Sequence, residues 1–565
     1  MNRVAGNLRH RLQGIRQPVF LPDFSGGYIG QSGLGIMKVR NGCQAVVIPL
    51  LGEPKMDLQF RLASDREIDC WISYPIGHLG DGEKLRFHST EPAVYREHLS
   101  AIEKNISLSA KPRDMEDIYT EPSRPRLRFT VKRGRSWDPN GLYYYDGIWH
   151  LFFQYNPTGP EGSNQHWGHA TSTNLFDWTQ QPFAIPKGLR WMAFSGSGVV
   201  DHNNDSGLKQ GDHPPILLFY SQNGRSATAL AYSTDGGKTY KQYEQNPLFL
   251  TNDPAGHDPK VVWYPPDEKW VMIIHDRRDK GPWTFDFYES KDLLDWEYMS
   301  SSHDWFETPD LFPMPLDGDT NNIKWVVQDV THSYRIGEFN GREFIPETEK
   351  ICNFYGMYLA PQTFNNAPDG RCVMMGSTPK GEYYQDDPAI HAAGGLNIPI
   401  DVTLRTSPTG KRLYLNPVEE IGQLVRKRYE FRDIGLEKLN SELSRIEPDL
   451  FDIAFEWDAG EQKDFVLDVW GVEVFRLHAA RGTYSVKGSG GQRKLYPRGD
   501  ANKVRVVCDR GLVSFYINDG YEAGNAYHSY PTFIPRGKPA IRVKGAAEQH
   551  FESFEVRVLR PMEWE

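Results

Sequence analysis

A polar turn that closes on an aromatic residue recurs three times along the middle of this chain. The three blocks, residues 172–178, 233–240 and 290–296, each begin with serine, end with tryptophan or tyrosine, and lie roughly sixty residues apart. Each follows a run that predicts a β-strand, such as residues 216–220 or 270–275. One sheet in every period is typical of a β-propeller. We therefore predict radial sheets whose innermost strands surround one axial pocket.

The composition supports a chain of many short strands. The 565 residues include 52 Gly and 39 Pro, and 13% are aromatic, which favours strands joined by turns. The length implies several domains and a core that needs no disulfides. The formal charge of -10 is modest, and no Lys/Arg block suggests a nucleic-acid surface. We expect an uncharged substrate and no nucleic-acid partner, while the sequence leaves the oligomeric state open.

The cysteines and the hydropathy indicate neither a metal site nor a membrane span. No apolar run reaches roughly 18 residues, and the basic first residues lack the apolar region of a signal peptide. We expect a cytoplasmic protein, although a processed signal peptide would leave the same sequence. We also expect no cofactor, no structural zinc and no disulfide framework, because no CxxC or His-rich pattern accompanies the five widely spaced cysteines, Cys43, Cys70, Cys352, Cys372 and Cys508.

Three acidic motifs are the candidate catalytic sites. They are Trp137-Asp138-Pro139-Asn140-Gly141, then His257-Asp258-Pro259-Lys260, and Phe306-Glu307-Thr308-Pro309-Asp310. A nearby proline keeps each carboxylate out of a helix and can aim it inward from a sheet edge. An isolated Asp-Pro pair is more often an ordinary turn. Three such carboxylates, all in aromatic-rich β segments, favour a shared pocket instead, and Asp146-Gly147 predicts a two-residue hairpin loop after the first of them.

With these motifs the chain resembles glycoside hydrolase family 32, the group of fructan-cleaving enzymes that includes invertase, inulinase and levanase. The resemblance extends over roughly residues 125 to 565. Besides the acidic motifs, it includes residues 154–157, 167–170, 177–178, 194–197, 360–364, 509–510, 513–515 and 518–520. It implies an all-β fold, with a five-bladed β-propeller followed by a C-terminal β-sandwich.

Composition places the domain boundaries. We predict an N-terminal β-rich accessory domain and linker at 1–124, the propeller at 125–425 and the β-sandwich at 426–565. Residues 111–126 are charged and Pro-rich, which is typical of a linker, and 418–428 suggest a short helix. For the β-sandwich we favour packing against the propeller over sugar binding. Alternation of apolar and polar residues predicts strands at 43–51, 57–62, 68–73, 451–457, 465–469 and 503–507.

The resemblance also implies the chemistry. Asp138 would attack C2 of a fructosyl unit, and Glu307 would protonate the leaving group and then activate water. Asp258 would stay ionised and accept hydrogen bonds from ring hydroxyls. Configuration would be retained, with the carboxylates of Asp138 and Glu307 roughly 5 Å apart. Burial beside Phe306 would raise the pKa of Glu307.

The same comparison implies a pocket for the terminal fructose. Aromatic rings suit sugar faces and amides suit paired hydroxyls. Taken alone, Trp167 and Phe194 are more often core residues, whereas Gln154 inside an apolar strand needs a polar partner. The implied substrate-binding residues are Asn140, Gln154, Trp167, Phe194, Ser195 and His257.

Three residues beside the carboxylates depart from the family pattern. Trp137 replaces Asn, His257 replaces Arg and Thr308 replaces Cys. The change to His257 exchanges a permanent bidentate donor for a titratable one, which should weaken or redirect recognition of fructose hydroxyls. Thr308 adds a hydroxyl that we expect to be able to hydrogen-bond Glu307 and so change the pH optimum.

Three functions fit these observations. The leading prediction is a retaining β-fructosidase that acts on sucrose or on inulin, levan and fructo-oligosaccharides. The second is a fructosyltransferase, in which a sugar hydroxyl replaces water. The third is a catalytically silent carbohydrate-binding protein, which Trp137, His257 and Thr308 would motivate. Because all three carboxylates are present, we favour an enzyme over a catalytically silent binding protein.

Overall fold

The computed structural model describes residues 119–564, with gaps at 133, 158–164, 188–190, 224–225, 254, 279–280, 357, 379–391, 461–462, 497–498 and 529–531. Before residue 119 it describes the backbone of six strands, which pair into one sheet: β1 (Val19–Phe20), β2 (Gly35–Lys38), β3 (Gln44–Val47), β4 (Pro54–Ser64), β5 (Glu67–Gly77) and β6 (Ser107–Ser109). These strands overlap the three predicted N-terminal runs, and the extent of an N-terminal domain stays a prediction.

Three antiparallel sheets follow in chain order. The first runs β10-β9-β8-β7, the second β11-β12-β13-β14 with β15 paired to β13, and the third β16-β17-β18-β19. Their strands are β7 (Gly134–Tyr145), β8 (Ile148–Asn156), β9 (His166–Ser172), β10 (Thr179–Ile185), β11 (Met192–Val200), β12 (Ile216–Asn223), β13 (Ala227–Ser233), β14 (Lys241–Gln242), β15 (Phe249–Leu250), β16 (His257–Tyr264), β17 (Lys269–Asp276), β18 (Thr284–Ser290) and β19 (Glu297–His303).

A nine-stranded sheet comes next, in the order β23-β22-β21-β20-β29-β26-β25, with β28 paired to β26 and β30 to β29. Strand β27 (Ala392–Ala393) instead joins β7 in the first sheet. The strands of the nine-stranded sheet are β20 (Asp310–Leu316), β21 (Asp319–Gln328), β22 (Tyr334–Phe339), β23 (Phe344–Pro346), β25 (Leu359–Thr363), β26 (Cys372–Thr378), β28 (Gly395–Leu396), β29 (Ile400–Ser407) and β30 (Gly410–Pro417).

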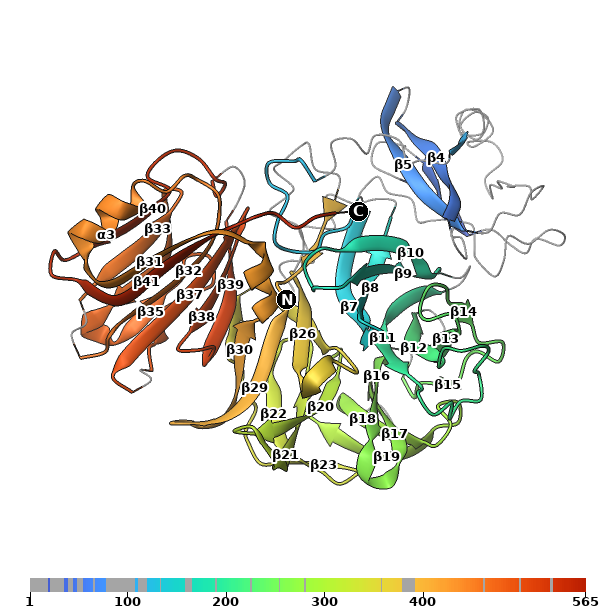
Figure 1. Ribbon diagram of the computed structural model, residues 1–565. Helices are drawn as coiled ribbons and strands as arrows, with labels where there is room; N and C mark the ends of the chain where they lie inside the picture. Colours follow the sequence, from blue (N-terminus) through green and yellow to red (C-terminus); the bar gives the residue numbers. More distant parts are fainter. Residues whose placement is uncertain are drawn as a thin grey trace.

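Figure 1 shows these sheets fanned around a common centre, with β7, β11, β16 and β20 innermost. Alternating side chains explain this arrangement, because successive residues of a strand face opposite sides of its sheet. In β12, Leu218 and Tyr220 pack towards the first sheet, whereas Leu217 and Phe219 pack towards the third. Each sheet therefore buries both faces against its neighbours.

The repeated polar blocks connect the third and fourth strands of the first three sheets. In each block the serine hydroxyl accepts the backbone N–H of the residue two positions later. The side chain of that later residue, Asn174, Asp235 or Asp292, then accepts further backbone N–H groups. In the first and third blocks the closing tryptophan, Trp178 or Trp296, donates its indole N–H back into the turn. The predicted period thus corresponds to one turn per sheet.

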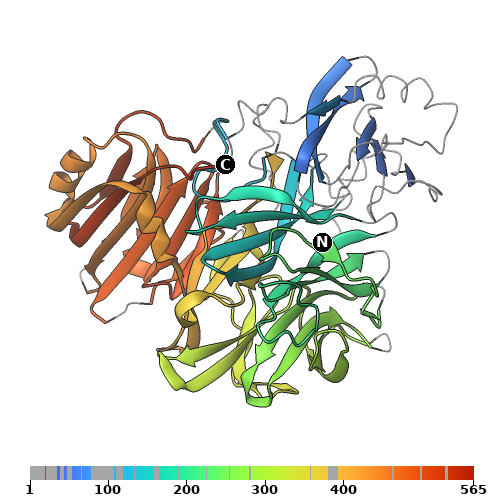
Figure 2. The same ribbon diagram turned by 45° about the vertical axis from the view of Figure 1, so that its right-hand side comes forward.

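Two further sheets form the C-terminal region and lie at one side of the ring in both views (Figures 1 and 2). Their orders are β24-β39-β38-β37-β32-β41-β31 and β36-β35-β34-β33-β40. The strands are β24 (Phe354–Gly356), β31 (Val425–Gly435), β32 (Leu450–Asp458), β33 (Phe465–Val469), β34 (Val472–His478), β35 (Thr483–Ser485), β36 (Arg493–Lys494), β37 (Ala501–Asp509), β38 (Leu512–Ile517), β39 (Glu522–Tyr527), β40 (Ile541–Gly545) and β41 (His550–Leu559).

Helices contribute little to the described part of the chain. Helix α3 (Leu436–Leu443) buries Leu436, Leu439 and Leu443 on one face against the C-terminal sheets. The remaining helices are 3-10 turns, namely η2 (Pro265–Asp267), η3 (Pro368–Gly370), η4 (Glu419–Leu424) and η5 (Ala479–Arg481). None of the helices described is long and apolar enough to cross a membrane.

Two local predictions need correction. The helix predicted over 418–428 is the short turn η4 followed by the start of β31, because the charged run from Val425 pairs with β41. The predicted linker at 111–126 also differs where it is described. There Arg124 is fully buried and hydrogen-bonds Glu121 and Thr130, while Tyr119 stacks on Trp564 at 4.0 Å.

Candidate active site

The three acidic residues lie at the innermost strands of three different sheets. Asp138 is inside β7, Asp258 is the second residue of β16, and Glu307 lies three residues before the start of β20. The strand pairing slips beside Asp138 and Asp258. The backbone φ is +68° at Asp258 and +49° at Glu307, a region that non-glycine residues adopt only uncommonly. Irregular backbone thus presents side chains that a regular strand would direct into the sheet interfaces.

Asp138 accepts two hydrogen bonds from neighbouring strands. The Ser195 hydroxyl donates to Oδ2 at 2.8 Å, and the Gln154 amide donates to the same oxygen at 3.2 Å. Gln154 is oriented in turn by the amide of Gln165, which donates to its Oε1 at 3.1 Å. Burial, reinforced by the nearby carboxylate of Asp258, raises the pKa of Asp138 to about 7, although the Ser195 hydroxyl opposes the increase.

Asp258 is the most enclosed of the three carboxylates. Its Oδ2 accepts the backbone N–H of Thr308 at 3.0 Å, and its own N–H donates to the hydroxyl of Ser221 at 2.7 Å. Burial raises the pKa of Asp258, while His257 and the Thr308 amide limit the increase. Two backbone-linked contacts therefore tie this residue to the second sheet and to the segment that carries the third acid.

Glu307 is more open, with 38% of its side chain exposed. Burial raises its pKa, the carboxylate of Asp258 raises it further, and His257 lowers it. Phe306, the preceding residue, is 45% exposed. The partly open acid thus differs in environment from the enclosed Asp258.

His257 lies between two of the carboxylates. Its Nε2 is 3.3 Å from Oδ2 of Asp258 and 3.8 Å from Oε1 of Glu307, while Nδ1 hydrogen-bonds the carbonyl oxygen of Ala255. Burial alone would lower the pKa of this imidazole, but Asp258, the Ala255 carbonyl and Glu307 outweigh burial and raise it.

The other predicted pocket residues divide into two groups. Gln154 and Ser195 contact Asp138 directly, and Phe194 is half-buried beside them. Trp167 corrects the prediction, because its side chain is completely buried in the core and its indole N–H donates to the carbonyl of Phe194 at 2.9 Å. Through this hydrogen bond it supports the strand that carries Phe194 and Ser195.

Asn140 is likewise fully buried. Within the described residues neither of its amide atoms has a hydrogen-bond partner. Its role in substrate binding stays a prediction.

The predicted hydrogen bond from the Thr308 hydroxyl to Glu307 is wrong. Among the described residues its Oγ1 has no partner, and Thr308 acts through its backbone N–H, which binds Asp258. At Trp137, the guanidinium of Arg135 lies 4.1 Å from the ring centre. Sequence patterns did not identify Gln165 and Ser221, which contact site residues. Ser221 is a polar residue in the apolar strand β12, whereas Gln165 lies just before β9 and carries no such signal.

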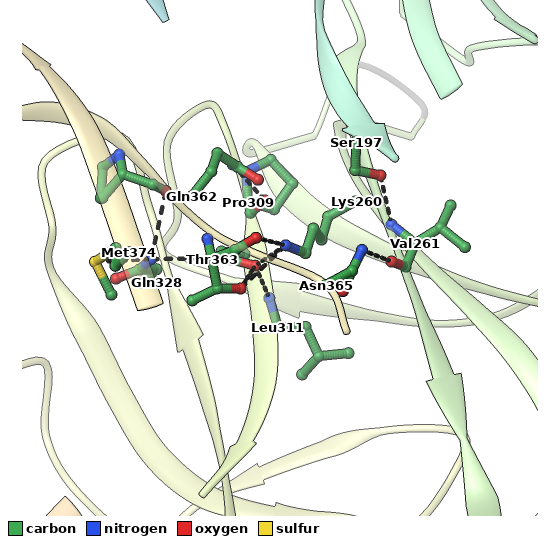
Figure 3. Close-up of polar contacts among 12 residues, drawn as sticks. Ser197, Lys260, Val261, Pro309, Leu311, Gln328, Gln362, Thr363, Asn365 and Met374 are labelled. Atoms are coloured by element: carbon green, nitrogen blue, oxygen red, sulfur yellow. Dashed lines mark hydrogen bonds and ion pairs between the residues drawn. The ribbon is translucent and has the colours of Figure 1, made fainter. Parts of the chain in front are cut away.

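A buried polar network is built from residues close in sequence to two of the acids (Figure 3). Lys260 follows Asp258 by two residues, and Asp310 follows Glu307 by three. The ammonium of Lys260 is 2.9 Å from Oδ1 of Asp310 and donates to the carbonyl of Thr363 at 2.9 Å. The backbone N–H of Thr363 donates to the carboxylate of Asp310 at 2.7 Å, and the side-chain amide of Gln328 donates to the same carboxylate at 3.2 Å. The network joins β16, β20, β21 and β25. Among the described residues there is no group of three or more side chains suited to hold a metal ion.

Comparisons with known proteins show which chains this protein is similar to. Residues 129–417 match the model of the glycosyl hydrolases family 32 N-terminal domain. A levanase of Bacillus subtilis is 30% identical over 464 residues, which are 74% of this chain and 67% of the levanase. Invertase 2 of Saccharomyces cerevisiae is 36% identical over 270 residues, 43% of this chain and 50% of the invertase.

Solved structures show the same fold. An exo-inulinase from Aspergillus awamori matches with a TM-score of 0.66 and 22% identity, covering 78% of this chain and 99% of the inulinase. A β-fructofuranosidase from Schwanniomyces occidentalis, complexed with fructosyl-erythritol, matches with a TM-score of 0.68 and 23% identity, covering 79% and 99%. From the family model and the levanase similarity together, this chain belongs to glycoside hydrolase family 32.

Proposed function

We propose that this protein is a retaining glycosidase that releases fructose from sucrose or β-fructans. The observation that carries the proposal is the set of three carboxylates, Asp138, Asp258 and Glu307, at the innermost strands of three sheets and in different surroundings. Unlike environments allow chemically similar groups to take different protonation states. The named relatives, a levanase and invertases, support the substrate class.

In the proposed mechanism Asp138 is the nucleophile. Its Oδ2 is held by Ser195 and Gln154, which leaves the other carboxylate oxygen to attack C2 of the fructosyl unit and form a covalent intermediate. Hydrogen bonds from Ser195 and Gln154 orient the group and stabilise its charged form. This arrangement suits attack from a fixed position.

Glu307 is the proposed general acid and base. Its raised pKa favours the protonated form that the first step needs, in which the leaving oxygen takes the proton. Its exposure suits the second step, in which the carboxylate removes a proton from water and the intermediate is hydrolysed. Asp258 stays ionised and accepts hydrogen bonds from fructose hydroxyls as positive charge develops on the ring.

We also propose that the catalytic domain has five blades. In the nine-stranded sheet, β20 to β23 follow a four-strand meander, and β25, β26, β29 and β30 form a second group. The two groups are joined through a single parallel pair, Leu316 with Leu404. Counted as separate blades, they bring the total to five. The domain bounds 125–425 and 426–565 are part of this proposal.

Fructose release from a panel of sucrose, kestose, inulin, levan and difructosides tests the activity. The matched variants Asp138→Asn and Glu307→Gln keep side-chain size and remove the proposed chemistry. The proposal requires release by the unmodified protein and its loss in both variants. Transfer of fructose to another sugar in place of water would identify a fructosyltransferase, and binding without turnover would identify a carbohydrate-binding protein.

A further inference from the structure

A backbone carbonyl oxygen beside one ring nitrogen of His257 constrains where the imidazole carries its proton. Its Nδ1 contacts the carbonyl oxygen of Ala255, and a carbonyl oxygen can only accept a hydrogen bond. Nδ1 must therefore carry a proton. The neutral ring would then have no proton on Nε2.

The opposite ring nitrogen faces two acidic groups. Nε2 lies 3.3 Å from Asp258 Oδ2 and 3.8 Å from Glu307 Oε1. A neutral ring with its proton on Nδ1 would direct a lone pair at these oxygens, whereas the imidazolium directs an N–H at them. Only the charged ring is complementary to the carbonyl and to ionised carboxylates at the same time.

Among the described residues, the charged side chains that act on His257 are all negative. The charged groups that act on His257 are Asp258 on its own strand, Glu307 before β20 and Asp138 on β7. On the adjacent strand β17 the ring of His275 lies 5.1 Å away. Burial lowers the pKa of His275 to about 3, so it is neutral at ordinary pH.

Hydrogen bonds also hold the segment that carries Ala255. The loop before His257 is held by the carboxylate of Asp276, which accepts the backbone N–H groups of Asn252 and Asp253 at 2.8 Å and 2.9 Å. Asp253 is in turn hydrogen-bonded by Arg277. The N–H of Ala255 donates to Asp253 at 2.9 Å, so the Nδ1 partner is linked to this held segment.

We propose that His257 is a titratable positioning residue, which holds Asp258 and Glu307 and offsets the negative charge of the site only while it is an imidazolium. This inference rests on the proposed function. A permanently charged Arg, the usual family residue here, would supply the charge at every pH. In this chain, by contrast, the charge is present only below the pKa of His257, so the site gains a pH dependence.

The variants His257→Gln and His257→Arg separate charge from the other roles of the side chain. Glutamine keeps an amide donor and removes the charge, while arginine keeps the charge at every pH. Without the cation the pKa values of all three carboxylates rise. We therefore expect both limbs of the pH profile of kcat/KM to move upward in His257→Gln, by about half a pH unit or more.

The acid limb of His257→Arg should coincide with that of the unmodified protein, because both carry the cation there. His478→Gln, in the C-terminal sheets, is the matched control and should move neither limb. If both limbs of the pH profile are unchanged in His257→Gln, the inference is overturned. The proposed function is judged separately, by whether the unmodified protein releases fructose.

A direct titration keeps the inference testable if the variants lose activity. Histidine labelled with ¹³C gives one ring resonance per residue, and the resonance missing from His257→Gln identifies His257. We expect it to titrate above the ordinary value of about 6.5 and to fall in Asp258→Asn. A midpoint below that value would contradict the inference whether or not the protein releases fructose.

Discussion

The ammonium of Lys260 and the carboxylate of Asp310 form a buried ion pair, with Nζ 2.9 Å from Oδ1. Lys260 follows Asp258 by two residues and Asp310 follows Glu307 by three. The pair therefore joins the strands that present two of the three acids, and its Thr363 partner adds a third strand. Such a pair fixes geometry at the cost of removing two charges from water.

Removal of one member of this pair should destabilise the fold strongly. In Lys260→Met the carboxylate of Asp310 would remain fully buried without its cation, which costs about 3 to 5 kcal/mol. Urea unfolding followed by tryptophan fluorescence measures the loss. Lys324→Met, which breaks pairs with Glu338 and Glu347 near the surface, is the control and should cost about 1 kcal/mol or less. Equal losses in the two variants would contradict the role given to the buried pair.

The hydroxyl of Ser195 should set the acid limb of activity. It donates to Asp138 at 2.8 Å and opposes the increase of that pKa to about 7. In Ser195→Ala the carboxylate loses this donor, its pKa rises further, and the acid limb of kcat/KM should move upward by roughly one pH unit. Ser197→Ala on the same strand is the control, because that hydroxyl accepts from the backbone of Val261. A shift common to both variants would count against the assignment.

The loss of activity when Glu307 is replaced should be larger for a poorer leaving group. A general acid assists departure most when the leaving oxygen is strongly basic. Glu307→Gln should therefore lose far more activity on sucrose than on an aryl fructoside, whose phenolate leaves without a proton. Initial rates on both substrates make the comparison. Equal losses would indicate that Glu307 acts in some way other than protonating the leaving group.

His275 should make the fold sensitive to acid. Burial lowers its pKa from 6.5 to about 3, so the folded state binds fewer protons than the unfolded state between these values. Its contribution is full above pH 6.5 and is lost as the pH falls below that, by roughly 3 kcal/mol near pH 4.5. His275→Phe, which can retain the stacking on Trp283, should therefore lose less of its melting temperature between pH 7 and 4.5. An unchanged slope would contradict this account.

Much of the architecture could be predicted because it depends on local residue patterns. The serine-led blocks became the turns after β9, β13 and β18. Asp146 and Gly147 form the expected hairpin loop, both with positive φ. The run 465–469 is β33 as predicted, and 451–457 and 503–507 lie within β32 and β37. Period-two alternation and turn chemistry need no knowledge of distant contacts.

The failures depend on tertiary contacts. The run from Val425 is a strand because β41 pairs with it, and that partner lies more than a hundred residues away in sequence. Trp167 was assigned to the pocket, but only the packing of the first two sheets shows that its ring is buried and that it acts through Phe194. The use of the Thr308 amide in place of its hydroxyl follows from a local φ of +38°, which side-chain identity does not reveal.

Fructose release by the unmodified protein and by Asp138→Asn is the most direct test of the account. We predict release from at least one of sucrose, kestose, inulin or levan, and a loss of at least about a thousandfold in kcat/KM in the variant, because its amide is a far weaker nucleophile. Comparable release by both proteins would contradict the assignment of Asp138 as the nucleophile, and no release by the unmodified protein would contradict the proposed activity.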